Sequence, residues 1–147
     1  FTATAKLCLT AKDQNQMGGI IMMGLDYSAL VVKRVGETFE LQQITCKSAD
    51  KGKPESVKVL DTLKPTLVDK IDYQPAIHEQ VYMRMVVREG KMQFYFSKDG
   101  KSFKKVGDEF TMREGKWIGA KVGFVAKEPE GKTNRGWIDV DWFRITK

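Results

Sequence analysis

The sequence predicts an all-β fold, a two-sheet antiparallel β-sandwich. Short segments alternate apolar and polar residues with a period of two, as in strands that bury one face. Turn-forming residues separate these segments at the spacing of about 8–12 residues that is typical of all-β folds. No long helical periodicity occurs in the 147 residues, a length that suits one domain with a sizeable core.

The first third of the chain predicts a meander of four strands. Phe1 to Thr10 alternates and predicts a half-buried strand, whereas the wholly apolar run from Ile20 to Met23 predicts an interior strand. Tyr27 to Arg34 and Phe39 to Thr45 complete the meander, with glycine-containing turns before each of them.

Lys47 to Glu79 is the least regular stretch. Val57 and Val59 indicate a short strand. Pro65 predicts a loop or an edge segment, because proline cannot donate a hydrogen bond into a sheet. We expect this stretch to cross between the two sheets.

Regular alternation returns at Gln80 and continues to Arg88, and Met92 to Ser97 forms the next strand. The Asp-Gly pair that follows Lys98 favours a tight hairpin, since it suits the positive backbone angles of such turns. Phe103 to Val106 then returns as a strand.

The last third of the chain predicts a strand, a polar loop and a closing strand. Ala120 to Ala126 alternates, and Lys127 to Arg135 is charged and contains both proline and glycine. In the closing strand we expect one face to carry Ile138, Val140 and Trp142, and the other to carry Trp137, Asp139, Asp141 and Phe143.

Composition excludes two classes of partner. The net charge of +6 comes from 25 Lys and Arg residues that are scattered along the chain without a nucleic-acid-binding motif, so we expect no nucleic-acid partner. No apolar run approaches the roughly 18 residues of a membrane span, so we expect no membrane partner. Cys8 and Cys46 can form a disulfide or stay free and buried, and neither belongs to a metal or redox motif.

The sequence lacks the residues of most enzyme active sites. Because His78 is the one histidine, no Ser-His-Asp, Cys-His or paired-histidine zinc arrangement fits, and we expect no catalytic residue. Asp139 and Asp141 share a strand face, but Trp137 and Phe143 occupy the flanking positions where a glucanase of this fold would carry glutamates. Three interpretations of the two aspartates stay open: a structural pair, ligands for a structural calcium ion, or a catalytic pair.

Sugar binding is the chemistry that the predicted strands can offer. Aromatic rings stack on pyranose faces, and amide and guanidinium groups bind hydroxyls. The outward residues Tyr82, Arg84, Gln93 and Tyr95 would lie on neighbouring strands of one face, with Tyr27 and Trp117 near them. The alternative is structural: Tyr82 and Tyr95 as a cross-strand pair, and Trp117 packed over the sheet.

Four motifs in order resemble the C-terminal domain of family 43 glycoside hydrolases, which are β-xylosidases and α-arabinofuranosidases. They are the first strand FTATAKL (1–7), the pair GGIIMM and YSAL (18–23 and 27–30), the hairpin YFSKDGKSF (95–103), and the closing strands GKWIGAKVGF and DVDWFRI (115–124 and 139–145). The resemblance covers nearly the whole chain apart from Lys47 to His78.

This resemblance implies a concanavalin A-like jelly roll that follows a five-bladed propeller, which carries the family's catalytic carboxylates. We therefore expect a non-catalytic accessory domain of an enzyme acting on xylan or arabinan side chains, as a piece of a longer protein, since Phe1 opens inside a strand. It would buttress the propeller and shape substrate access, and Lys47–Ser56 or Lys127–Arg135 are the loops that would reach the active-site pocket.

The expected partners are the propeller domain in cis and plant cell-wall polysaccharide. We expect no required cofactor, with structural calcium at Asp139 and Asp141 as the alternative, and we favour a secreted or periplasmic location over a cytoplasmic one. Two other functions stay open: a free-standing lectin-like carbohydrate-binding module, and a small concanavalin-like glucanase that uses the two aspartates.

Overall fold

The computed structural model describes residues 1–71, 74–114, 119–129 and 136–147. Within these ranges the chain forms strands joined by turns and one 3-10 turn, η1 (Ala49–Lys51). The strands are β1 (Thr2–Ala11), β2 (Met17–Met23), β3 (Tyr27–Val35), β4 (Thr38–Cys46), β5 (Ser56–Leu63), β6 (Leu67–Ile71), β7 (Gln74–Arg88), β8 (Lys91–Ser97), β9 (Lys104–Thr111), β10 (Lys121–Lys127) and β11 (Trp137–Thr146).

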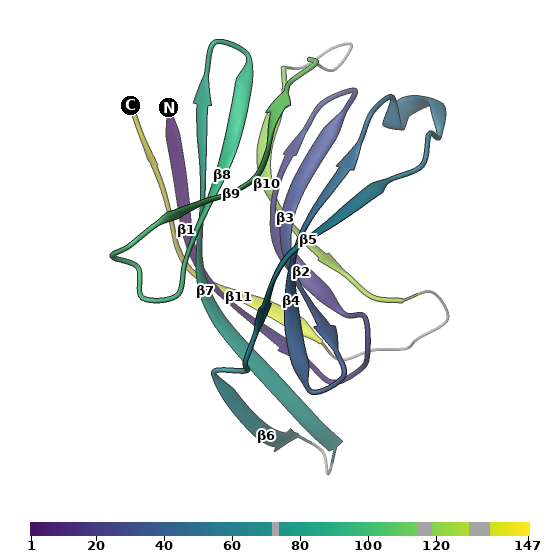
Figure 1. Ribbon diagram of the computed structural model, residues 1–147, viewed down its shortest axis with the longest axis vertical. Coiled ribbons are helices and arrows are strands. Elements are labelled where there is room, and N and C mark those ends of the chain that lie inside the picture. The colour runs from purple at the N-terminus through teal and green to yellow at the C-terminus, as the bar shows by residue number, and fades with distance from the viewer. Residues whose placement is uncertain (72–73, 115–118, 130–135) are drawn as a thin grey trace.

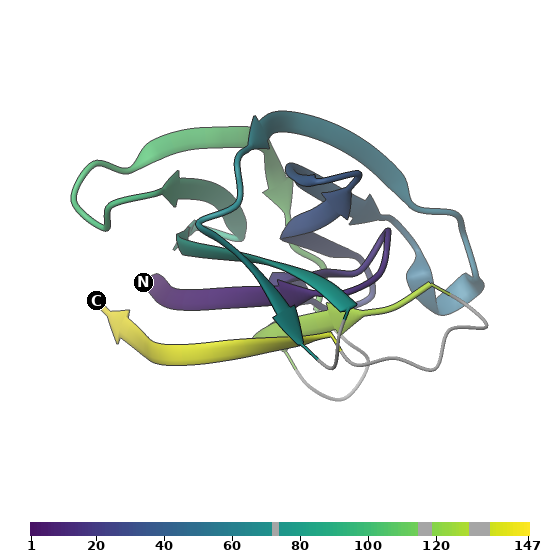
Figure 2. The same cartoon turned by 90° about the horizontal axis from the view of Figure 1, so that it is seen from below.

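The strands form two antiparallel sheets that pack face to face (Figure 1). Sheet A has the order β11-β1-β7-β8-β9, with β6 pairing to β7, and sheet B has the order β10-β2-β3-β4-β5. The first and last strands of the chain pair within sheet A, which places the two termini side by side (Figures 1 and 2). The predicted all-β sandwich is confirmed.

The stretch that the sequence left irregular is more ordered than expected. β7 begins at Gln74 rather than at Gln80, because β6 pairs with its first residues, from Leu67 opposite His78 to Ile71 opposite Gln74. Pro75 pairs with β6 alone, since the pairing of β7 with β1 ends at Ile77. Proline is tolerated there because its missing N–H is not needed by a second neighbour.

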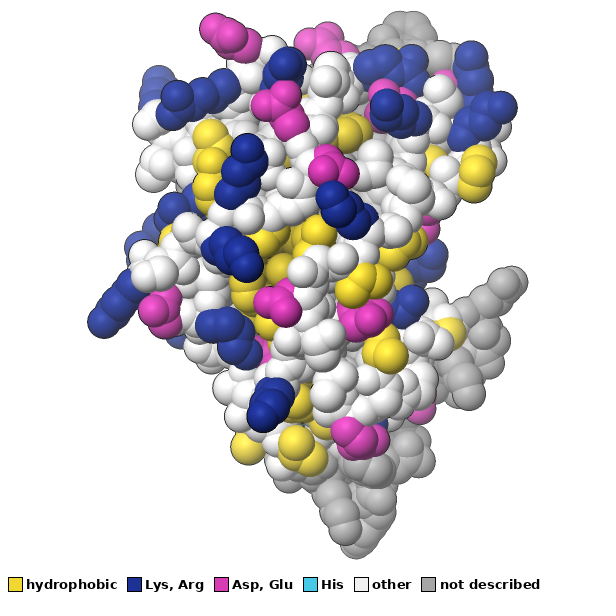
Figure 3. Space-filling model, viewed as in Figure 1, with side chains coloured by type: hydrophobic (Ala, Val, Ile, Leu, Met, Phe, Trp, Pro, Cys, Tyr) yellow, Lys and Arg dark blue, Asp and Glu magenta, His cyan; other side chains and the backbone are white. Residues whose placement is uncertain are grey.

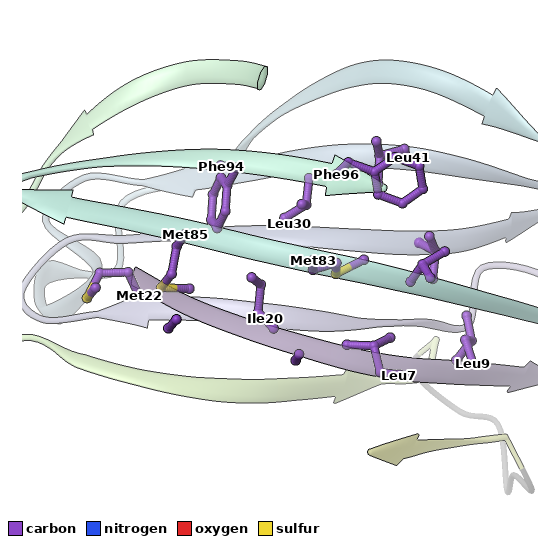
Figure 4. Close-up of a cluster of buried hydrophobic side chains, with 14 of the residues drawn as sticks. Leu7, Leu9, Ile20, Met22, Leu30, Leu41, Met83, Met85, Phe94 and Phe96 are labelled. Carbon is purple, nitrogen blue, oxygen red and sulfur yellow. The ribbon is translucent and has the colours of Figure 1, made fainter. Parts of the chain in front are cut away.

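The main core fills the space between the sheets. The alternation of the strands turns apolar side chains inward, and Figure 4 shows Leu7, Met83 and Phe94 of sheet A beside Ile20 and Leu30 of sheet B. Each of these five is at most 2% exposed. Burying a side chain of this size contributes about 1.5–3 kcal/mol, so the interleaved sheet faces hold the sandwich together.

A second, smaller cluster lies on the opposite face of sheet B. Ile21, Ala29, Val31 and Ile44 are all buried there, whereas Ile20, Met22, Leu30 and Val32 on the same strands point into the main core. The central strands of sheet B therefore carry apolar residues on both faces, which explains the continuous apolar run that marks β2 in the sequence.

β11 corrects one prediction from the alternation. Lys6 of β1 pairs with Trp142 and the next residue, Leu7, pairs with Val140, so Asp141 is a bulged residue between them. A bulge adds one residue to a strand and reverses the alternation beyond it. Trp142 therefore lies on the outer face of sheet A, and Phe143 turns toward sheet B, where it packs edge-on against Phe124 with ring centroids 5.3 Å apart.

Candidate functional site

Three of the predicted sugar-binding residues lie together on the outer face of sheet A. Arg84 of β7 is paired with Tyr95 of β8, and Tyr82 lies two residues before Arg84 on the same face. The Arg84 guanidinium stacks on the Phe103 ring at 3.6 Å from its centroid, and Nε donates to the Thr4 hydroxyl at 2.9 Å. Arg84 is thereby held between β1 and the end of the β8–β9 loop.

Trp142 extends this aromatic surface, and sequence reasoning missed it. Its ring lies 6.1 Å from the Tyr82 ring at an interplanar angle of 52°, and the Arg144 guanidinium covers it at 4.4 Å. The Lys6 ammonium lies 5.9 Å from the Tyr82 centroid. Gly100 of the β8–β9 loop approaches Tyr82 so closely that an added Cβ would lie 2.8 Å from its ring. Only the bulge at Asp141 makes Trp142 part of this face.

Gln93 serves the sheet itself. It is buried, and its Nε2 donates to the backbone oxygen of Val106 at 2.8 Å and of Gly107 at 3.3 Å. These bonds span the irregular pairing between β8 and β9, whose register shifts between Met92 and Phe94. The amide is therefore engaged in stabilising a bulge.

Tyr27 belongs to the other sheet. It lies on β3 of sheet B, and its hydroxyl donates to the Glu55 carboxylate. Burial and this carboxylate raise the pKa of Tyr27 well above its ordinary value. It is thus separated from Tyr82 by the sandwich, and the expected proximity of the two is wrong. Trp117 lies outside the described residues.

Asp139 and Asp141 each have a partner within sheet A. Asp139 accepts a hydrogen bond of 2.9 Å from Nε1 of Trp137, and Asp141 forms a 3.0 Å ion pair with Nζ of Lys6. Within the described ranges no three His, Cys, Asp or Glu residues gather as metal ligands would. Calcium binding at these two aspartates stays a prediction.

His78 and Glu79 lie in regular structure, in β7, where the sequence predicted an irregular stretch. Nδ1 of His78 is 2.9 Å from the Thr10 hydroxyl. Glu79 is fully buried, where Nζ of Lys98 and the hydroxyl of Thr66 contact its Oε1. Burial raises the pKa of the Glu79 carboxyl despite these two partners.

A cleft of about 510 Å³ opens where β9 of sheet A passes β5 of sheet B. Figure 3 shows the side of the molecule on which β9 and β5 lie, with hydrophobic side chains in its centre among basic and acidic groups. Gln43 crosses between the sheets here: its Nε2 donates to the backbone oxygen of Asp108 at 3.0 Å and its Oε1 accepts from the Asp108 N–H at 2.8 Å. Nζ of Lys58 pairs with the Asp108 carboxylate at 2.9 Å.

Asp26 closes one end of this cleft. Arg113 donates to both carboxylate oxygens, Nε at 2.7 Å and Nη2 at 2.6 Å, and the Ser48 N–H donates to Oδ1 at 2.6 Å. These bonds, that of Arg113 above all, lower the pKa of Asp26 to about 2. Because Asp26 is paired with Arg113 and Asp108 with Lys58, charged groups of this cleft connect segments that are distant in the chain.

Comparison with known proteins identifies the family of this sandwich. Residues 1–146 match the family model of the β-xylosidase C-terminal concanavalin A-like domain. The chain belongs to this family. A β-xylosidase of Formosa agariphila is 40% identical over 63 residues, which are 43% of this chain and 10% of that protein. The recognition made from the four motifs is confirmed.

Solved structures contain the same fold. The GH43 protein BlXynB of Bacillus licheniformis matches 97% of the chain with a TM-score of 0.65 at 18% identity, and the match covers 26% of that protein. The bifunctional GH43-CE protein of Bacteroides eggerthii matches 97% with a TM-score of 0.67 at 15% identity, over 17% of its length. A functionally unknown protein of Saccharomyces cerevisiae matches 99% with a TM-score of 0.61 at 15% identity, over 70% of its length.

The chain thus spans between 10% and 26% of the length of these relatives, and it is an accessory C-terminal domain of GH43 β-xylosidase-type proteins. No helix among the described residues is long and apolar enough to cross a membrane.

Proposed function

We propose that this domain is non-catalytic, that it buttresses the catalytic propeller of a GH43 enzyme acting on xylan or arabinan side chains, and that it shapes the approach of substrate. The observation that supports the proposal most is the end-to-end match to a C-terminal domain that makes up only 26% of the BlXynB chain. The rest of such a chain, about three-quarters of its length, is long enough to contain a catalytic domain.

The chemistry of the carboxylates on sheet A supports a non-catalytic role. Glycoside hydrolysis needs two carboxyl groups across the scissile bond, one to protonate the leaving oxygen and one to act as nucleophile or base. Asp141 is neutralised by Lys6 and Asp139 accepts from Trp137. Each carboxylate therefore already has a side-chain partner within sheet A.

The experiment compares the 147-residue chain, the whole parent enzyme, and the parent enzyme without these residues on aryl-β-xyloside and aryl-α-arabinoside. We expect no hydrolysis by the chain alone. We expect the truncated enzyme to unfold at a lower temperature and to lose at least tenfold in kcat/KM on these substrates. Hydrolysis of either substrate by the chain alone would overturn the proposal, and its loss in Asp141→Asn would assign the activity to the aspartates.

A second candidate function is direct glycan binding by the outer face of sheet A. The observation in its favour is the joined surface of Tyr82, Arg84, Tyr95 and Trp142, which offers rings and a guanidinium on adjacent strands. Affinity electrophoresis in xylan, arabinoxylan, arabinan and β-glucan gels, with and without EDTA, tests it. Retardation that Tyr95→Ala weakens about tenfold would support binding, since a stacked ring is worth on the order of 1–2 kcal/mol. EDTA sensitivity would show that binding also needs calcium.

A further inference from the structure

Large hydrophobic side chains lie exposed along one edge of the sandwich. This edge strip consists of Phe124 on β10 and Val140, Phe143 and Ile145 on β11, and each of the four is at least 37% exposed. β10 ends sheet B and β11 ends sheet A, so no strand among the described residues closes the sandwich on this side. Figure 2 shows the two strands along the same edge of the molecule.

The side chains of the edge strip lie on the inner faces of their two sheets, the faces that also form the core. In the strand pairing, Phe124 lies opposite Ile20, Val140 opposite Leu7, Phe143 opposite Ala5 and Ile145 opposite Ala3, and all four of these partners are buried. The bulge at Asp141 is what turns Phe143 and Ile145 to this side. The strip is therefore a continuation of the core surface that sheet B does not cover.

The chain ends lie at this strip. Thr2 pairs with Thr146 and Ala3 with Ile145, so Phe1 lies at the start of the strand that neighbours β11, where its backbone bonds to Val87 of β7. Phe1 is itself 45% exposed. In its GH43 relatives the domain makes up 26% and 17% of the chain. A domain joined to Phe1 begins beside an apolar surface of aromatic and aliphatic side chains, the composition that the buried centre of a domain interface has.

We propose that the edge strip is the face on which the preceding catalytic domain packs, with an apolar patch of that domain covering Phe143 and Ile145. This inference rests on the proposed function and adds the surface that carries it out. The outer face of sheet A is a poor alternative for a dry interface, because Lys6, Arg84 and Arg144 lie on it. Contact at the edge strip also leaves that face open to solvent.

The test introduces one cysteine at a time into the whole parent enzyme, in a Cys8→Ser background, and follows alkylation of each introduced cysteine by mass spectrometry. Ile145→Cys probes the strip, and Val57→Cys is the matched control on β5 at the other edge of sheet B. The two native side chains have nearly the same exposure in this domain, 58% and 55%. We expect the cysteine at 145 to react at least tenfold more slowly than that at 57.

The other possible outcomes would contradict the proposal in different ways. Equal rates at both sites would overturn the strip as the docking face, whereas the truncation experiment on kcat/KM would still decide the proposed function independently. Slow reaction at 57 alone would move the interface to β5. Protection at 145 that disappears on dilution would assign the strip to a second copy of the chain and overturn the catalytic domain as its occupant. As a second variant, Ile145→Lys should raise the radius of gyration of the parent enzyme in solution scattering, and an unchanged radius would contradict the proposal.

Discussion

The Asp26→Asn substitution tests whether the ion pair at the end of the cleft holds the domain together. The Asp26 carboxylate joins the β2–β3 turn to Ser48 after β4 and to Arg113 after β9, through three hydrogen bonds of 2.6–2.7 Å. Asparagine keeps the shape of the side chain but removes its charge and leaves a single acceptor oxygen. Two of the three bonds therefore weaken or disappear.

The size of the effect follows from the pKa. The Asp26 pKa falls from 3.8 to about 2, which at about 1.4 kcal/mol per unit corresponds to roughly 2 kcal/mol of stabilisation by the charged form. The Arg113 side chain is 48% exposed, so solvent screens the pair and we expect about 1–2 kcal/mol. For a domain of this size that loss lowers the Tm by about 3–6 °C.

The lowered pKa of Asp26 also predicts how its stabilisation of the fold changes with pH. Because the pKa of Asp26 is lower in the folded than in the unfolded state, its stabilisation is fully present above pH 3.8 and is lost as the pH falls from 3.8 to about 2. Urea unfolding of the wild type and of Asp26→Asn should therefore differ at pH 7 and 5, and the difference should shrink below pH 4. The exposed Asp61→Asn is the control and should change stability by less than about 0.5 kcal/mol.

A double-mutant cycle completes this test. If Asp26 acts through Arg113, Asp26→Asn should cost little in an Arg113→Met background, because the partner is already gone. A loss of stability that is the same at pH 3 and pH 7, or that is undiminished in the Arg113→Met background, would refute the reasoning from the ion pair.

Two further substitutions test the close packing and the buried charge. Gly19→Ala should destabilise the domain by about 2–4 kcal/mol in urea unfolding, because the added Cβ would lie 1.9 Å from the backbone oxygen of Leu30 on the paired strand. The control Gly36→Ala should cost about 1 kcal/mol, because its Cβ meets open space and only the positive φ of 64° opposes it. Equal costs would contradict the packing argument. Lys98→Met should cost about 1–2 kcal/mol at pH 7, because it leaves the buried Glu79 carboxylate without its cation. This cost should shrink as the pH falls toward 4.5 and Glu79 takes up a proton, whereas the loop control Lys101→Met should have little effect at either pH. A cost independent of pH would show that Lys98 contributes by packing alone.

Part of the candidate surface could be predicted from the sequence. Tyr82 and Arg84 alternate on one strand, and the Glu89-Gly90 turn brings the strand of Tyr95 back beside them, so the period of two and a short hairpin suffice to place all three on one face. Trp142 could not be placed there, because the bulge that turns it outward depends on pairing with β1, at the other end of the chain. The Asp26–Arg113 pair was missed for the same reason, since the two residues lie on different segments.

Other residues show where the local pattern was insufficient. Tyr27 lies in a strand, as predicted, but alternation shows only that a side chain points to one face of a sheet and not to which sheet its strand belongs. Gln93 alternates outward as well, yet the register shift between β8 and β9 directs its amide to backbone oxygens of the neighbouring strand.

The sequence by itself determined that the chain is built of strands, which side chains are apolar enough to be buried, and, through its motifs, the family to which it belongs. Alternation and turn residues act between near neighbours in the chain, so their signal is visible without the fold. Only the tertiary structure decided which strands pair, where β11 carries its bulge, and that the core continues onto an uncovered edge beside Phe1. These features depend on contacts between β1 and β11, whose register is set by packing across the whole sandwich and not by either strand alone.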